Sequence, residues 1–177
     1  MDVRLRRYRR EDAAALREAA LESTEQIAPW MPWCHAAYAL EDGLAWIDRC
    51  EAAWANGTEY DFAIVDGGGR FLGGCGLNQL RPEHRIANLG YWVRTSATRR
   101  GAATAAARQL AAFAFRETTL VRLEIVVAVG NVASHRVAEK VGAIREGLAH
   151  DRLYAHGRSL DAVVYAVLRS RHAPSLT

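Results

Sequence analysis

The stretch TRRGAATAAARQLAAFAF, residues 98–115, decides how the rest of the chain is interpreted. Two arginines and a glycine precede an alanine-rich run whose composition is typical of a helix. One interpretation is an ordinary helix start, for which Thr95, Ser96 and Thr98 offer capping hydroxyl groups. The alternative is a loop that holds a phosphate, because a helix N-terminus carries four unpaired N–H groups and a partial positive charge.

Small and basic residues at the start of this run suit a phosphate. Gly101, Ala102 and Ala103 leave the backbone open to close approach, while Arg99 and Arg100 add positive charge. A diphosphate would fit there. The segment is not a nucleoside triphosphate loop, because no Lys-Ser/Thr pair follows the glycine. The segment alone leaves both interpretations open, so the neighbouring segments decide between them.

Composition is typical of one soluble globular domain: 177 residues, 50% hydrophobic and 24% charged. No apolar run is long enough for a membrane span, and the basic N-terminus lacks the apolar core of a secretory signal. We therefore expect a cytoplasmic protein with no membrane partner.

Cys34, Cys50 and Cys75 form no CxxC pair and are expected to be reduced. The six histidines show no metal-binding spacing, so we expect no metal.

Residue patterns predict a strand and helix order of β-α-α-β-β-β-α-β-α-β-β. The expected strands are residues 3–9, 59–66, 70–78, 85–94, 121–129, 143–154 and 159–168, and the expected helices are residues 12–23, 40–56, 101–117 and 131–141. This order predicts a mixed sheet with helices on both faces. With no repeat or linker, we expect a single domain over residues 1–177. Ligands in such sheets bind beyond the carboxyl ends of central strands, here after Val93 and Val129.

Three longer segments resemble the GNAT superfamily of acyl-CoA N-acyltransferases. They are NLGYWVRTSATRRGAATAAARQLAAFAF, VRLEIVVAVGNVASHRVAEKVGAIREG and DRLYAHGRSLDAVVYAVL. The resemblance covers most of the chain and implies an α/β (α+β) fold with a mixed, mostly antiparallel central sheet of about seven strands flanked by helices. In that family a loop of pattern Gln/Arg-x-x-Gly-x-Gly/Ala holds the CoA diphosphate, and here it falls on residues 98–103. Thr98 departs from the usual Gln or Arg.

Within the superfamily, the chain most resembles ribosomal-protein N-terminal (RimJ/RimL-like) acetyltransferases. The features are APWMPW before the second helix, Asn131-x-x-Ser134, and YAHGRSLDAVVYAVL near the end. Many other members carry a tyrosine seven residues after that asparagine; this chain has Ala138, and the Ser134 branch similarly lacks the tyrosine. The resemblance implies an acetyl-CoA-dependent N-acetyltransferase acting on a primary amine. The acceptor would be a protein N-terminal α-amine or a small amine.

The resemblance also implies cofactor contacts. Backbone groups of Trp92, Val93 and Arg94 would pair with the pantetheine arm like an extra strand. Asn131 is a candidate pantetheine contact and also a candidate N-cap. Ser134 is the candidate catalytic residue, as a proton donor or positioner at the sulfur; the alternative is a serine that satisfies backbone N–H groups at the helix start. The expected contacts at the diphosphate are Arg99, Arg100, Gly101, Ala102, Ala103 and Thr104.

The sequence leaves alternatives open for the wall of the acceptor site and for the general base. Trp30, Trp33 and Tyr38 lie in the region that forms the acceptor wall in the family, although they would equally pack the helices onto the sheet. The family often has a glutamate at the position of Asn88. Other candidates for the base are Glu83, Glu124, His150 and Asp151. A proton relayed by solvent, or an amine that enters neutral, would serve as well.

Some features of the sequence are also compatible with two other classes of function. A non-catalytic acyl-CoA-binding or sensing module on the same fold is favoured by the departures at Asn88, Thr98 and Ala138. A nucleic-acid-binding domain is suggested by five arginines in the first ten residues, but the net charge is only +3 and no aromatic-basic interleaving follows. We therefore expect no nucleic-acid partner. The resemblance to the family implies either a monomer or a homodimer paired through the final strands.

Overall fold

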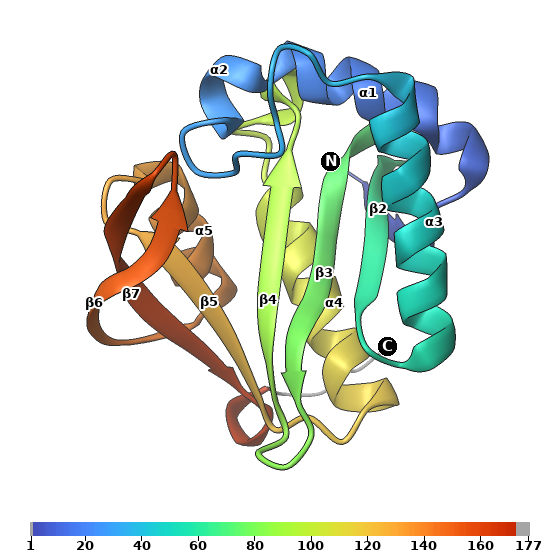
Figure 1. The fold of residues 1–177 in the computed structure, drawn as a ribbon. Coiled ribbons are helices and arrows are strands. Elements are labelled where there is room, and N and C mark those ends of the chain that lie inside the picture. The colour runs from blue at the N-terminus through green and yellow to red at the C-terminus, as the bar shows by residue number, and fades with distance from the viewer. Residues whose placement is uncertain (1, 173–177) are drawn as a thin grey trace.

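Seven strands form one sheet in the computed structural model, which describes residues 2–172 (Figure 1). The strands are β1 (Val3–Arg6), β2 (Tyr60–Asp66), β3 (Phe71–Arg81), β4 (Ile86–Val93), β5 (Arg122–Ala128), β6 (Ile144–Ala155) and β7 (Arg158–Leu168). The α-helices of the described residues are α1 (Ala13–Glu22), α2 (Thr24–Ile27), α3 (Leu40–Asn56), α4 (Ala102–Glu117) and α5 (Val132–Val141). The single domain expected over residues 1–177 extends beyond the described range at both ends.

The sheet is mixed and mostly antiparallel, as the sequence led us to expect. Its strand order is β1-β2-β3-β4-β5-β7-β6, and every neighbouring pair is antiparallel except β4 and β5. The parallel pair is short, because residues 86–88 of β4 pair with residues 122–124 of β5 and no further. Beyond these residues the two strands diverge (Figure 1). The second half of β4 therefore has one edge without a partner among the described strands.

Helices cover both faces of the sheet. α4 packs behind β3 and β4 in Figure 1, where its fully buried Ala106, Ala107 and Leu110 contact the core of the sheet. Alanine is small enough to let the helix approach the strands closely, which explains the alanine-rich composition of this helix. α1 packs on the other face, where Leu16 and its neighbours meet Phe71 of β3 in a second cluster. α3 packs against α1 and β2.

The N-terminal elements differ from the expectation in two places. β1 ends at Arg6 rather than Arg9, because Asp12 draws the chain into a turn. The Asp12 carboxylate accepts two hydrogen bonds from the Arg6 guanidinium group, at 2.6 and 2.7 Å, and one from the Arg9 N–H group at 2.8 Å. Helix α1 consequently begins at Ala13, after a 3₁₀ turn. The four-residue helix α2 was not predicted.

Candidate active site

The turn before α4 presents backbone N–H groups at the end of the sheet. Gly101 is the N-cap residue, with a left-handed φ of 82°, and a Cβ atom added there would meet nothing within 4 Å. The first backbone hydrogen bond at this end runs from Ala105 N–H to the Gly101 carbonyl oxygen, at 2.9 Å. Within the described residues, the N–H groups of Ala102, Ala103 and Thr104 have no backbone acceptor.

The hydroxyl groups expected as caps do not serve this helix. The N-cap makes no side-chain hydrogen bond, and Thr98 Oγ1 donates instead to the Thr95 carbonyl oxygen at 2.8 Å. Of the two interpretations left open by the sequence, the structure does not have the hydroxyl-capped helix start. Arg99 and Arg100 are exposed beside the open N–H groups. The arrangement provides hydrogen-bond donors and positive charge for an external anion.

The unpartnered edge of β4 faces the divergence between β4 and β5. Arg94 N–H donates to the Leu72 carbonyl oxygen of β3 at 2.7 Å, and the Arg94 carbonyl oxygen accepts from Ala97 N–H at 2.9 Å. Because backbone groups alternate in direction along an antiparallel strand, those of Trp92 also point to β3, while those of Val93 point away. Of the three residues expected to pair with a pantetheine arm, Val93 presents its backbone groups on the open edge. Both backbone groups of Arg94 are already bonded within the protein, and the expected contact through Arg94 stays a prediction that would use the second lone pair of its carbonyl oxygen.

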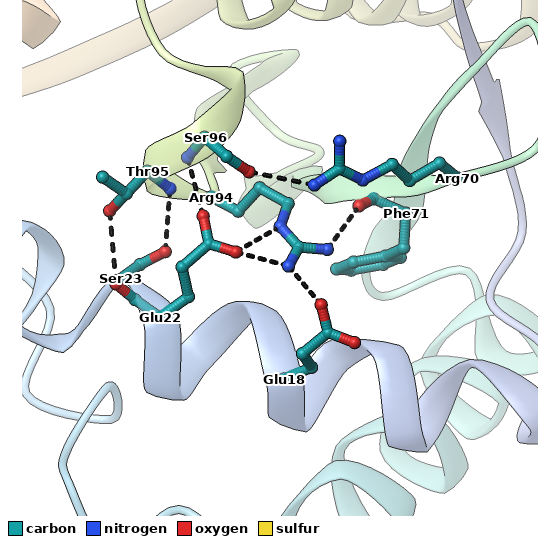
Figure 2. Close-up of polar contacts among 8 residues, drawn as sticks. All are labelled: Glu18, Glu22, Ser23, Arg70, Phe71, Arg94, Thr95 and Ser96. Atoms are coloured by element: carbon teal, nitrogen blue, oxygen red, sulfur yellow. Dashed lines mark hydrogen bonds and ion pairs between the residues drawn. The ribbon is translucent and has the colours of Figure 1, made fainter.

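Arg94 instead ties the end of β4 to α1 (Figure 2). The residue is only 3% exposed. Its Nε atom donates to Glu22 Oε2 at 2.8 Å, and its Nη2 atom bonds both Glu22 and Glu18. A longer contact of 3.4 Å joins Nη1 to the Phe71 carbonyl oxygen. The buried guanidinium group is therefore paired with two carboxylates from one helix.

The same carboxylate also holds the chain that follows β4 (Figure 2). Glu22 accepts from Ser96 N–H at 2.6 Å, and Ser23 Oγ accepts from Thr95 N–H at 3.0 Å. Burial by itself would raise the pKa of Glu22, but the hydrogen bonds from Arg94 and Ser96 lower it to about 2. α1 thus fixes the segment that leads into the turn before α4.

Asn131 and Ser134 lie at the start of α5, across the gap from β4. Asn131 is the N-cap, and its side-chain oxygen accepts from Ser134 N–H at 3.1 Å. The Ser134 hydroxyl oxygen is 3.0 Å from the phenolic oxygen of Tyr91, which is also 3.1 Å from the Ser134 carbonyl oxygen. Burial raises the pKa of Tyr91 to about 12, so the phenol keeps its proton at neutral pH. Sequence reasoning missed Tyr91, although it lies in the quoted GYWVR strand.

A cavity of about 500 Å³ lies between α3 and strands β3 and β4, beneath the loop of residues 28–39. Its walls include the aromatic side chains of Tyr8, Trp33, Tyr38, Trp46 and Trp92. The rings of Trp33 and Trp92 meet edge to face with their centroids 5.1 Å apart. These side chains make the walls largely apolar and rigid.

Glycines in β3 make room for the side chains of this cavity. A Cβ atom at Gly74 would lie 2.3 Å from the Tyr8 hydroxyl oxygen, and one at Gly76 would lie 2.0 Å from Asp61 Oδ1. The glycine-rich sequence of this strand, predicted only as a strand over residues 70–78, therefore allows Tyr8 and Asp61 to lie directly against the sheet.

Asp61, on β2, is a buried acid in the cavity wall. It is 6% exposed, and its Oδ2 atom has no hydrogen-bond partner within the described residues. Burial, followed by the charge of Glu59, raises its pKa to about 6, with Arg49 and the Cys50 thiol opposing the shift. Sequence reasoning missed Asp61. The available signal was its position, because it alternates with Phe62 along the strand and so faces the helix α3 side.

The three residues expected at an acceptor wall separate into two groups. Trp33 and Tyr38 line the cavity. Trp30 lies against Gly130 instead, where an added Cβ atom would come within 3.1 Å of its ring. Trp30 therefore covers the turn between β5 and α5. The structure thus brings the loop of residues 28–39 into contact with both the cavity and the start of α5.

None of the residues weighed as a general base, Glu83, Glu124, His150 and Asp151, lines the cavity. Glu124 is paired with Arg81 at 3.1 Å and with Arg122 at 2.9 Å. Asn88, at the position of the family glutamate, donates from Nδ2 to Asn78 Oδ1 at 2.9 Å. The titratable side chains that do line the cavity, cysteine and tyrosine aside, are His35, Asp42, Arg49 and Asp61.

Metal-ligating side chains do not gather in groups of three or more anywhere in residues 2–172. Over the same range, no helix is both long and apolar enough to cross a membrane. Cys34, Cys50 and Cys75 are free and buried, and burial raises the pKa of each thiol.

Comparison with known proteins supports this description. Residues 2–144 match the family model described as an acetyltransferase (GNAT) domain. The chain is 31% identical to the "Putative ribosomal N-acetyltransferase YdaF" of Bacillus subtilis, covering 94% of this chain and 91% of that protein. It is 29% identical to RimJ of Mycobacterium smegmatis in complex with CoA-disulfide, with a TM-score of 0.87, covering 94% and 81% of the two chains. The ribosomal-protein-S5-alanine acetyltransferase of Vibrio fischeri, at 19% identity, shares the fold with a TM-score of 0.86, covering 98% and 97%.

Proposed function

This chain belongs to the GNAT family of N-acetyltransferases, and from that premise we propose that it moves the acetyl group of acetyl-CoA to the N-terminal α-amine of a protein. The observation that carries the proposal is the open turn before α4, which follows the unpartnered part of β4 along the chain. Both features present backbone groups to an extended ligand. The name of one relative, a putative ribosomal N-acetyltransferase, supports the choice of a protein acceptor.

The turn before α4 has the properties that a diphosphate requires. The N–H groups of Ala102, Ala103 and Thr104 would donate to the phosphate oxygens, and the absence of a side chain at Gly101 admits them closely. Arg99 and Arg100 are exposed and would attract the diphosphate by their positive charge, without each making a pair of hydrogen bonds to one phosphate. The backbone of Val93 would pair with the pantetheine arm on the open edge of β4.

Acetyl-CoA supplies an activated acetyl thioester when it is bound. We assign Ser134 the role of giving a proton to the departing sulfur, with Tyr91 holding the serine hydroxyl group in place at 3.0 Å. Asn131 orients the same helix start through its bond to Ser134 N–H. Because Asn88 is bonded to Asn78 and carries no charge, we assign removal of the amine proton to solvent.

The acceptor would approach through the cavity below the loop of residues 28–39. Trp33 and Tyr38 form part of its wall, and Trp30 covers the turn before α5. An N-terminal segment of a few residues is compatible with a volume of about 500 Å³.

Calorimetric titration with acetyl-CoA tests the first part of this proposal. We expect the wild type to bind and Gly101→Glu to lose binding, because a carboxylate would lie against the diphosphate. Gly57→Glu is the matched control, since Gly57 also has a left-handed φ, of 65°, and ends α3 far along the chain from the turn. Loss of binding in both variants, or no binding by the folded wild type, would overturn the phosphate site.

Release of free thiol tests the second part. A short peptide with a free N-terminal alanine should release thiol from acetyl-CoA, whereas the same peptide with a blocked N-terminus should not. If the acetyl group is transferred to small amines but not to the peptide, the acceptor is a small amine and not a protein N-terminus. Binding of acetyl-CoA with no transfer to either class would instead identify a non-catalytic acyl-CoA-binding module.

A further inference from the structure

Asp61 is a carboxyl group that the fold does not satisfy. Its Oδ2 atom has no hydrogen-bond partner within the described residues, although the residue is only 6% exposed. Buried carboxylates are normally paired or hydrogen-bonded, because leaving one without a partner is unfavourable. An aspartate kept in this position without a partner from the chain therefore points to a partner from outside it.

The nearest cationic side chain is already engaged. Arg49 forms an ion pair with Glu59 at 3.2 Å and lies over the ring of Trp46, with its guanidinium carbon 4.4 Å from the centroid. It opposes the rise in the pKa of Asp61 through its charge but does not bond the carboxylate. The Cys50 thiol faces the carboxyl group as well, and it is a weak donor. The local charges leave the aspartate open to a further cation.

The walls around Asp61 suit a cation on an apolar stem. Tyr8, Trp33, Tyr38, Trp46 and Trp92 line the same cavity. Aromatic faces attract ammonium and guanidinium groups, and they also pack against the methylene groups that carry them. An apolar, aromatic cavity with one buried carboxylate has the chemistry of a site for an alkylammonium or alkylguanidinium group.

Asp61 lies too far from the open edge of β4 to contact the amine that reacts there. Asp61 pairs with Gly76, and its carboxylate lies over that residue, because a Cβ atom added at Gly76 would come within 2.0 Å of Asp61 Oδ1. The carboxylate is therefore about one strand spacing, or about 5 Å, from β4, and the open edge of β4 faces away from β3. We propose that the cavity binds a second cationic group of the acceptor, and that Asp61 is the residue that pairs with it. This inference rests on the proposed function, because it assumes that the reacting amine lies at the edge of β4. A basic side chain next to a protein N-terminus and the far ammonium group of a diamine share this chemistry.

Matched acceptors test the proposal by kinetics. The peptide amides Ala-Arg-Ala and Ala-citrulline-Ala have nearly the same shape and differ in the charge of the second side chain. We expect the wild-type kcat/KM to be about tenfold or more higher for the arginine peptide, as one charge-assisted hydrogen bond provides. Asp61→Asn should reduce this ratio to near one while leaving the affinity for acetyl-CoA unchanged. The same ratio of kcat/KM is measured for two small acceptors, 1,5-diaminopentane and pentylamine, which differ in the second ammonium group. The two acceptor pairs together distinguish a basic peptide side chain from the far ammonium group of a diamine.

Asp48→Asn is the control variant for these measurements. Asp48 is on the same helix as Arg49, is largely exposed, pairs with Arg10 at 2.6 Å and does not line the cavity. It should keep the wild-type preference for the charged acceptors. A wild-type ratio near one for both acceptor pairs, or an unchanged ratio in Asp61→Asn, would overturn the role of Asp61 while leaving the acetyltransferase function intact.

Direct binding separates failure of this inference from failure of the proposed function. In the absence of acetyl-CoA, 1,5-diaminopentane should raise the Tm of the wild type more than pentylamine does, and Asp61→Asn should remove the difference. If this holds while no acceptor is acetylated, the cation site stands and the proposed function falls. If acceptors are acetylated but the diamine gives no added shift in Tm, the cation site is overturned.

Discussion

The hydroxyl oxygen of Ser134 in α5 lies 3.0 Å from the phenolic oxygen of Tyr91 in β4. This contact crosses the gap where β4 and β5 diverge, and it is supported by a second contact from the phenol to the Ser134 carbonyl oxygen. Because burial raises the pKa of Tyr91 to about 12, the phenol stays protonated and can donate. The phenol donates its one proton to the Ser134 carbonyl oxygen, so the pair holds the serine hydroxyl group on the β4 side of the gap with the phenolic oxygen as its acceptor.

Removing the Ser134 hydroxyl group should slow transfer with little effect on cofactor binding. We expect Ser134→Ala to lower kcat about 100-fold, as loss of a positioned proton donor does, while the Kd for acetyl-CoA stays within about twofold. Tyr91→Phe keeps the ring and removes only the bond to the serine, so its kcat should fall by about tenfold or less. Steady-state kinetics with calorimetry of acetyl-CoA binding measures both quantities. A Ser134→Ala enzyme with wild-type kcat would show that the serine only satisfies the helix start.

Glu22 should contribute stability that depends on pH. Its pKa is lowered to about 2 in the folded protein, against 4.5 ordinarily, so its contribution is complete above about pH 4.5 and is lost as the pH falls towards 2. Glu22→Gln should lower the free energy of unfolding by about 2 kcal/mol at pH 7, less than the full shift implies because solvent screens the partly exposed carboxylate. Thermal unfolding between pH 7 and pH 3 measures the difference, which should narrow towards pH 3.

Glu25→Gln is the matched control for that experiment, because Glu25 is exposed on the neighbouring helix α2. Its Tm should follow that of the wild type at every pH. Glu22→Gln should also weaken acetyl-CoA binding severalfold, since Ser96 N–H loses a charged acceptor just before the turn at Gly101. If the difference in Tm between the wild type and Glu22→Gln is the same at pH 3 as at pH 7, the effect does not come from the charge of Glu22.

Sequence reasoning located the features that depend on short segments. The turn at Gly101 and the helix start at Asn131 are local patterns of small and capping residues, so their positions were predictable. The role of Arg94 was not, because its partners Glu18 and Glu22 lie more than 70 residues earlier in the chain. The same holds for Asp61, whose environment depends on a glycine in a neighbouring strand. Local sequence shows residue type and spacing, whereas burial without a partner is a property of the assembled sheet.

Gly76→Ala tests the steric basis of the Asp61 position. The added Cβ atom would lie 2.0 Å from Asp61 Oδ1 and 3.2 Å from its Cα atom, so the aspartate side chain must move and the strands must adjust. We expect a loss of about 1–3 kcal/mol in the free energy of unfolding, measured by urea denaturation. Gly147→Ala in β6 is the control, since its added Cβ atom meets nothing within 4 Å. The double variant Gly76→Ala/Asp61→Ala should lose less than the sum of its singles; strict additivity would contradict the clash.

Asp61→Asn should stabilise the protein at neutral pH, since an aspartate retained for ligand binding is unfavourable for the fold. The pKa of Asp61 is raised to about 6 in the folded protein, against 3.8 ordinarily, mainly by burial. Ionisation therefore destabilises the fold fully above about pH 6, partly between pH 6 and 4, and not below. The variant should gain about 2 kcal/mol in the free energy of unfolding at pH 7.5, and the gain should vanish near pH 4.

The other groups facing Asp61 should not produce this pH profile. Burial raises the pKa values of the neutral groups around it, Tyr8, Cys50 and Cys75, so they keep their protons throughout. The ion pair of Arg49 and Glu59 is present in both proteins, and its effect cancels in the comparison. Urea denaturation at pH 7.5, 6 and 4.5 measures the gain for Asp61→Asn, with Asp48→Asn as the exposed control. A loss of stability at pH 7.5 would mean that the carboxylate already has a partner within the fold, and it would remove the reason to seek one in the acceptor.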